Sequence, residues 1–312
     1  MPLIFPKTTA PDRIAQRSRA ASRTTDALAP LHLWHLASLD APTVALAWAS
    51  SFAWAAGTHL SLQATAVIAL GVWTVYVSDR LLDARASLRH HTEHRLRERH
   101  YFHWRHRRVF VPFAVAAGAA TAILVLGCIP VVARERDSVL AAASLAYFAR
   151  VHQSQLSQAR RSRPFFPPLV TKELLVGVLF AVGCALPALG AAWAAPATTR
   201  WVLIGCLAFL AALAWLNCHA IERWESETSC RSVLSLAELA CGLASFGLGA
   251  ALLICRAHPR PALLVAAAAF SALLIALLDK IRTQLTAVTL RAAADLVLLA
   301  PAFVILIARL VR

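Results

Sequence analysis

The chain has 312 residues, of which 59% are hydrophobic and only 15% are charged, and its mean hydropathy is +0.62. A soluble domain carries about 25% charged residues to cover its surface, so this composition excludes an ordinary soluble protein. The formal net charge is +15, but the basic residues lie between apolar runs, as at a cytoplasm-facing membrane surface. The composition therefore predicts an integral membrane protein whose basic surface meets membrane lipids and not nucleic acid.

The first 39 residues differ from the rest of the chain, because they are polar and contain no long apolar stretch. Basic residues are spread through them, so we expect no cleavable signal peptide. We predict that residues 1–39 form a cytoplasmic, partly disordered arm with a short interfacial helix around Leu31–Leu39. The remaining residues, 40–312, are predicted to form one transmembrane domain.

Nine apolar runs follow the arm. A helix needs about 20 residues to cross the bilayer, and eight of the runs approach or exceed that length, whereas the fourth run is short. The sequence therefore predicts an all-α bundle of about nine transmembrane helices. The runs cover residues 41–59, 62–79, 109–132, 138–151, 169–193, 200–221, 232–255, 261–279 and 288–311.

The arginines give the expected orientation. If all nine runs cross, the arm and the segments 80–108, 152–168, 222–231 and 280–287 lie on one side. The segment 80–108 alone holds nine arginines, and basic loops stay on the cytoplasmic side. We therefore expect a cytoplasmic N terminus, nine spans, and a place in a bacterial inner membrane. Without the short fourth span, the later basic segments would face the other side.

The first acidic cluster lies at the end of the second run, within Tyr76–Asp83. Asp79 and Asp83 are four residues apart, so a continuing helix places both on one face. Two carboxylates this close need a neutralising cation. Such a pair can hold Mg²⁺, which binds carboxylate oxygens together with substrate phosphates. The alternative is an ordinary helix end neutralised by Arg80 or other arginines.

The second acidic cluster lies at the end of the sixth run. Asn217 and Glu225 are eight residues apart on one helix face, and Glu222 is about one turn from Glu225. A charged side chain in the middle of a span costs about 2.5–3.5 kcal/mol on insertion scales, so we expect these acids near the interface. An amphipathic helix end is again the alternative.

With these two clusters, the chain resembles the UbiA superfamily of membrane prenyltransferases over residues 40–303. That family has nine spans, with one acidic motif after the second and another after the sixth. Its first motif is NDxxDxxxD, of which Asp79 and Asp83 match the last two acids, while other residues replace the leading Asn-Asp pair. Its second motif is DxxxD, which appears here in altered form. The residues in that second position are Asn217, Glu222 and Glu225.

Lys172 adds to the resemblance, because the stretch Thr171–Gly177 is similar to the family's lysine followed by an apolar LxxG run. The resemblance implies Mg²⁺-dependent transfer of a polyprenyl group from a diphosphate to a lipophilic, aromatic acceptor, as in quinone, haem or chlorophyll pathways. It implies three kinds of site residue. These are Mg²⁺ ligands at Asp79, Asp83, Glu222 and Glu225, catalytic residues at Asp79, Asp83 and Lys172, and substrate-binding residues at Tyr76, Arg80, Arg160, Arg161, Lys172 and Asn217.

Two alternatives remain open. The replaced motif residues also suit a non-catalytic or divergent UbiA-like protein that binds lipid or has a structural role. A transporter is the other alternative, although no run looks broken at its midpoint and no inverted repeat is visible. Asp295 lies inside the last run, four residues after Arg291, and this spacing predicts an ion pair within one helix.

Overall fold

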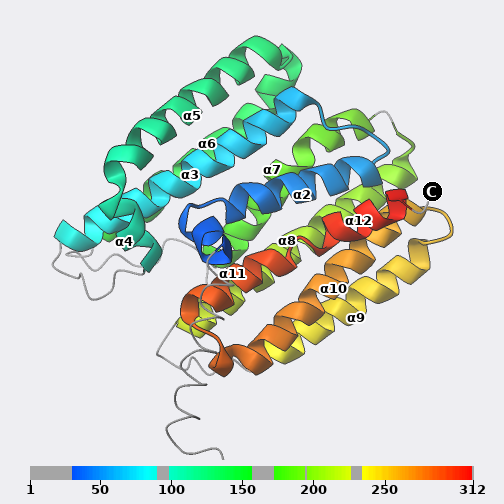
Figure 1. The fold of residues 1–312 in the computed structure, drawn as a ribbon. Coiled ribbons are helices and arrows are strands. Elements are labelled where there is room, and N and C mark those ends of the chain that lie inside the picture. The colour runs from blue at the N-terminus through cyan, green and yellow to red at the C-terminus, as the bar shows by residue number, and fades with distance from the viewer. Residues whose placement is uncertain (1–29, 90–97, 157–171, 194, 226–233, 311–312) are drawn as a thin grey trace, which may run out of the picture.

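The computed structural model describes residues 30–89, 98–156, 172–193, 195–225 and 234–310, and every regular element in these ranges is a helix (Figure 1). A short helix at residues 30–36 precedes α2. The later elements are α2 (Asp40–Ala55), α3 (Leu62–Arg89), α4 (Glu98–Arg105), α5 (Arg107–Cys128), α6 (Val131–Leu156), α7 (Lys172–Ala192), α8 (Ala197–Glu225), α9 (Leu236–Ile254), α10 (Pro259–Ile281), the 3₁₀ turn η2 (Arg282–Gln284), α11 (Ala287–Val297) and α12 (Ala300–Leu310).

Each of the nine predicted runs is largely helical where the structure describes it, so the prediction of an all-helical protein is confirmed. Seven helical stretches of the described chain, the last formed by α11 and α12 together, are long and apolar enough to cross a membrane, which indicates an integral membrane protein. The other two runs correspond to α2 and α6. With 16 residues, α2 extends over about 24 Å, less than the ~30 Å of a bilayer's hydrocarbon core. The 26 residues of α6 include four consecutive charged ones, Arg134–Asp137.

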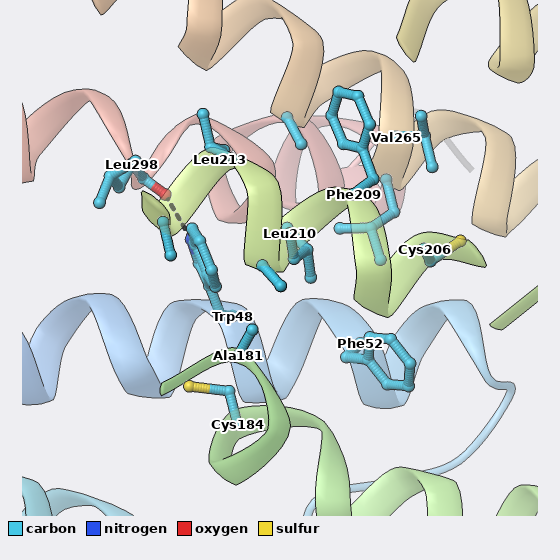
Figure 2. Close-up of a cluster of buried hydrophobic side chains, with 14 of the residues drawn as sticks. Trp48, Phe52, Ala181, Cys184, Cys206, Phe209, Leu210, Leu213, Val265 and Leu298 are labelled. Atoms are coloured by element: carbon cyan, nitrogen blue, oxygen red, sulfur yellow. Dashed lines mark hydrogen bonds between the residues drawn. The ribbon is translucent and has the colours of Figure 1, made fainter. Parts of the chain in front are cut away.

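The core of the bundle lies where α2 packs against α7, α8 and α10. Trp48, Phe52 and Leu210 are fully or almost fully buried there (Figure 2). Small residues let the helices approach closely, as is common between helices in a membrane. A Cβ on Gly177 of α7 would lie only 2.7 Å from the backbone nitrogen of Trp215 in α8. The α7–α8 contact therefore depends on a glycine at this position.

Helices α3, α5 and α6 lie side by side along one flank of the bundle (Figure 1). These helices leave large apolar side chains uncovered: Phe113 is 63% exposed, Ile123 70% and Val139 72%. Contact with water would make such a surface costly, whereas contact with lipid tails would not. This flank has the character of a lipid-facing surface.

The ninth predicted run is broken between α11 and α12, which corrects the expectation of an uninterrupted helix. Pro301 has no N–H, so the carbonyl of Val297 loses its partner in the helix. The hydroxyl of Ser271 donates to that carbonyl at 2.8 Å, and the indole N–H of Trp48 donates to the carbonyl of Leu298 at 2.8 Å (Figure 2). Side chains from α10 and α2 thus satisfy the backbone groups that the break releases.

Candidate functional site

Ionisable and hydrogen-bonding side chains gather beside the start of α2, the last turn of α11 and the C-terminal turns of α3 and α8. Charged groups inside a membrane protein are costly and commonly mark functional sites. These residues come from segments far apart in the sequence. We call them the buried polar cluster; its members are His35, Ser38, Asp40, Arg80, His103, Asn217 and Asp295.

Arg80 ties the last turns of α3 to the segment that precedes α2. Its side chain is 4% exposed. Nη1 donates to the backbone carbonyl of His35 at 3.0 Å and to Oγ of Ser38 at 2.6 Å, while Nη2 lies 3.4 Å from Oδ2 of Asp40. A guanidinium that is buried needs such acceptors, because an unpaired charge in the interior is strongly unfavourable. The Tyr76 ring lies 5.9 Å from the same guanidinium.

His35 lies between two carboxylates. Its Nδ1 atom is 2.6 Å from Oδ2 of Asp40 and 3.6 Å from Oδ2 of Asp295, and the facing ligand atoms of the three residues all lie within 4.8 Å of one another. Burial lowers the pKa of His35, but the interactions with Asp295 and Asp40 outweigh burial and raise the pKa above 6.5. The two carboxylates thus favour a positive charge at this position.

Ser38 and His103 complete the side of the cluster next to α4. Ser38 has a φ angle of 60°, in the left-handed region that residues other than glycine rarely adopt. Its hydroxyl lies 3.0 Å from Nε2 of His103, whose Nδ1 lies 2.8 Å from the carbonyl of Arg99. A carbonyl only accepts, so Nδ1 carries the proton and Nε2 accepts from Ser38. Burial lowers the pKa of His103 to about 4, so the ring is neutral at pH 7.

Asn217 brings α8 into the cluster. Its Nδ2 donates to Oδ1 of Asp295 at 3.4 Å, and Asn217 is only 5% exposed. Its Oδ1 atom is buried without a hydrogen-bond partner. Asp295 does not form the predicted ion pair with Arg291. Arg291 instead pairs with Glu225 of α8, and Asp295 faces His35.

The acidic residues predicted from the sequence lie around the cluster and are more exposed. Asp79 and Asp83 are half-buried in α3, and Oδ2 of Asp83 lies 3.9 Å from Nε2 of His100. Glu222 is exposed, and Glu225 has Arg291 as its ion-pair partner. Among the described residues, these four carboxylates do not form a group within metal-ligand reach, whereas His35, Asp40 and Asp295 do.

The other predicted residues are less informative. Lys172 is the first residue of α7, but its side chain lies outside the described part of the chain, as do Arg160 and Arg161 entirely. The guanidinium of Arg80 is committed to three protein acceptors, so its observed role is to position the segment before α2.

The four predicted carboxylates do not fit Mg²⁺ as one ligand set, because Glu225 is neutralised by Arg291 and Glu222 is exposed. Asp79 and Asp83 fit it better. Mg²⁺ is commonly held by one or two carboxylates, with substrate phosphates and water supplying the other oxygens. This pair lies on one face of α3 and could supply such carboxylates.

Sequence reasoning missed the role of His35 and Asp40. Both lie at the junction of the predicted arm and the first run, where no spacing links them to Asp295. The one available signal was Asp295 itself, since an acid inside an apolar run needs a partner from elsewhere.

The sequence matches no protein-family model and no curated protein, and the structure matches no solved structure. The fold and the cluster by themselves define a helical integral membrane protein with an ionisable centre at one end of its bundle.

Proposed function

We propose that the protein is a divergent UbiA-type enzyme that transfers a polyprenyl group from its diphosphate to a lipophilic, aromatic acceptor in a Mg²⁺-dependent reaction. One observation carries this proposal: α3 and α8, the helices that bear the two acidic motifs, meet through one chain of polar contacts. The chain of contacts runs through Arg80, Asp40, His35, Asp295 and Asn217.

The proposal includes a nine-span topology with a cytoplasmic N terminus in a bacterial inner membrane. The two helices that are too short or too charged to be identified as spans by length and hydropathy, α2 and α6, would then cross the membrane as well. Helix α2 can cross although it is short, because 12 of its 16 residues are buried in protein. It therefore does not have to match the thickness of the surrounding lipid. The charged Arg134–Asp137 stretch of α6 would lie at the membrane surface opposite the cytoplasm. The apolar residues that follow it would then cross the membrane.

The residues divide into two groups with different tasks. Asp79 and Asp83 would hold Mg²⁺ with the diphosphate, and the metal would supply charge neutralisation of the leaving group. Lys172, Arg160 and Arg161 would add positive charge there, as the resemblance implies. Arg80, Asn217 and the ring of Tyr76 would shape the end of the bundle below that site. The exposed apolar flank of α3, α5 and α6 gives lipophilic molecules a membrane-facing approach.

A second candidate is a UbiA-like protein that binds a lipid diphosphate or has a structural role without catalysis. The ion pair between Glu225 and Arg291 favours it, because that pair removes one predicted metal ligand. A transporter is disfavoured by the Ser271 and Trp48 hydrogen bonds at the α11–α12 break, because transporters use released carbonyls to bind ions.

The test is prenyl transfer in membranes that contain the protein, with labelled polyprenyl diphosphates, Mg²⁺ and a panel of aromatic acceptors. Asp79→Asn and Asp83→Asn are the test variants. Glu135→Gln is the matched control, because Glu135 is an exposed carboxylate on α6 and has no place in the proposed site.

We expect a Mg²⁺-dependent lipophilic product in the wild type and the Glu135→Gln control. Loss of one metal-bound carboxylate should lower the rate at least tenfold in each Asp variant. Mg²⁺-dependent diphosphate binding without product, in the presence of the full panel, would support the non-catalytic candidate. Absence of both product and binding would refute both candidates.

A further inference from the structure

The contacts around His35 resemble a coordination site more than a closed hydrogen-bond network. One ring nitrogen faces two carboxylates, yet that nitrogen forms no well-aligned hydrogen bond to either of them. An imidazole nitrogen carries at most one proton and cannot donate fully to two acceptors. A metal ion, in contrast, binds several ligand atoms that converge on one point.

We propose that His35, Asp40 and Asp295, with Oδ1 of Asn217, form a site for a divalent transition metal ion. The inference does not depend on the proposed prenyl transfer, and the site is distinct from the Mg²⁺ site at Asp79 and Asp83.

The separations of the ligand atoms are compatible with a common metal. Metal bonds to nitrogen and carboxylate oxygen are about 2.0–2.2 Å long, which places neighbouring ligand atoms about 3 Å apart and opposite ones about 4 Å apart. The Nδ1 atom of His35 lies 2.6 and 3.6 Å from the two carboxylate oxygens. Shifts of a few tenths of an ångström would bring these atoms to coordination distances.

Asn217 provides an independent indication. Its Oδ1 is a buried acceptor without a partner, while its Nδ2 contacts Asp295. A buried polar atom without a hydrogen bond costs about 1–3 kcal/mol, so native proteins normally satisfy such atoms. A metal ion bound by Asp295 would give this oxygen a partner.

The surrounding residues orient the ligands. Arg80 donates to the carbonyl of His35 and lies 3.4 Å from Asp40, so it fixes both residues from outside the site. Outer partners of this kind commonly hold metal-ligating carboxylates in place.

Charge and ligand type narrow the choice of ion. When His35 is neutral, the two carboxylates and Arg80 together carry one negative charge. Binding of a divalent ion changes this net charge to one positive charge. Hydroxide or another anion bound at an open coordination position can neutralise it. One imidazole and three oxygens favour Mn²⁺, Fe²⁺ or Zn²⁺ over Mg²⁺, which prefers oxygen alone.

The experiment measures metal bound to the purified full-length protein in detergent, without any prenyl diphosphate. After exposure to Mn²⁺ or Zn²⁺ and removal of free ions, elemental analysis gives the stoichiometry, and the electron paramagnetic resonance spectrum reports on bound Mn²⁺. The test variants are His35→Gln and Asp295→Asn. Asp279→Asn is the control, because Asp279 pairs with Arg282 and Trp224 away from the cluster.

We expect about one ion per wild-type chain, the same in Asp279→Asn, and at least a tenfold loss of affinity in both test variants. Chelation should also lower the thermal stability of the wild type, since a ligand that binds only the folded state stabilises it. A folded wild-type protein that binds neither Mn²⁺ nor Zn²⁺ would overturn the proposal and leave a protonated His35 between the carboxylates. Equal binding by wild type and His35→Gln would overturn it as well.

Discussion

The interior of the bundle and its rim contain similar residue types in very different environments. In the interior, Arg80 is 4% exposed and holds the segment before α2 with three contacts. At the rim, Arg282 forms an ion pair with Asp279 at 3.1 Å, but its side chain is 45% exposed. We therefore expect burial, more than residue type or distance, to decide how much each of these polar contacts contributes to stability.

The largest effect is expected for the two arginines. Arg80→Ala would leave Asp40 buried without its guanidinium partner, and breaking a buried pair costs about 3–5 kcal/mol. Arg282→Ala removes an exposed pair worth about 0–1 kcal/mol. Thermal unfolding of both variants in the same detergent measures the contrast. Similar losses of stability would show that the cluster is no more important than a surface pair.

Two glycines extend the comparison to packing. Gly177→Ala places a methyl group against the backbone of α8, and overpacking of this kind costs about 1–3 kcal/mol. Gly205→Ala is the exposed counterpart, since a Cβ there meets nothing within 4 Å. We expect Gly205→Ala to be neutral or slightly stabilising in the same unfolding assay. A stable Gly177→Ala variant would contradict the close α7–α8 contact.

Two serines test the break between α11 and α12. Ser271→Ala removes the donor to the carbonyl of Val297 and should destabilise the protein by about 1 kcal/mol. Ser245 is exposed on α9, so Ser245→Ala should have little effect. Chemical denaturation of the two variants provides the comparison, and equal midpoints would show that the hydroxyl of Ser271 is dispensable at the break.

Two histidines extend the comparison to an effect that depends on pH. Burial lowers the pKa of His103 from its ordinary value of 6.5 to about 4, and its charged neighbours are Arg80, Asp40 and Arg99. Between pH 6.5 and 4 the unfolded chain therefore takes up a proton that the folded protein resists, so stability falls as the pH falls. His103→Gln should flatten this slope between pH 7 and 5.

His106 is exposed and close to His103 in the chain, so His106→Gln is the matched control for the loss of an imidazole. An unchanged slope in His103→Gln would show that this ring does not resist protonation.

The sequence predicted local structure well and long-range contacts poorly. Hydrophobic runs identified the helices because each run is a continuous signal, and arginine-rich segments separated them. The spacing of Asp79 and Asp83 correctly placed them on one helix. The partners of Asp83 and Arg80 could not be predicted, because His100 and the segment around His35 approach α3 only through tertiary packing.

Asp295 shows the same limit. Its spacing from Arg291 favoured a pair within one helix, but Arg291 reaches across to Glu225 and Asp295 faces His35, 260 positions earlier in the chain. Pro301 was visible in the sequence, yet the break that it causes also depends on Ser271 and Trp48. A proline alone does not reveal which side chains will satisfy the released carbonyls.

The central claim is that the interior cluster maintains the fold while the α3 carboxylates beside it bind the substrate. The most direct test measures thermal stability and Mg²⁺-dependent binding of labelled geranylgeranyl diphosphate on the same samples of wild type and Asp83→Asn. The account predicts a melting temperature within about 2 °C of the wild type and binding at least tenfold weaker. A large loss of stability in Asp83→Asn, or unchanged binding, would contradict it.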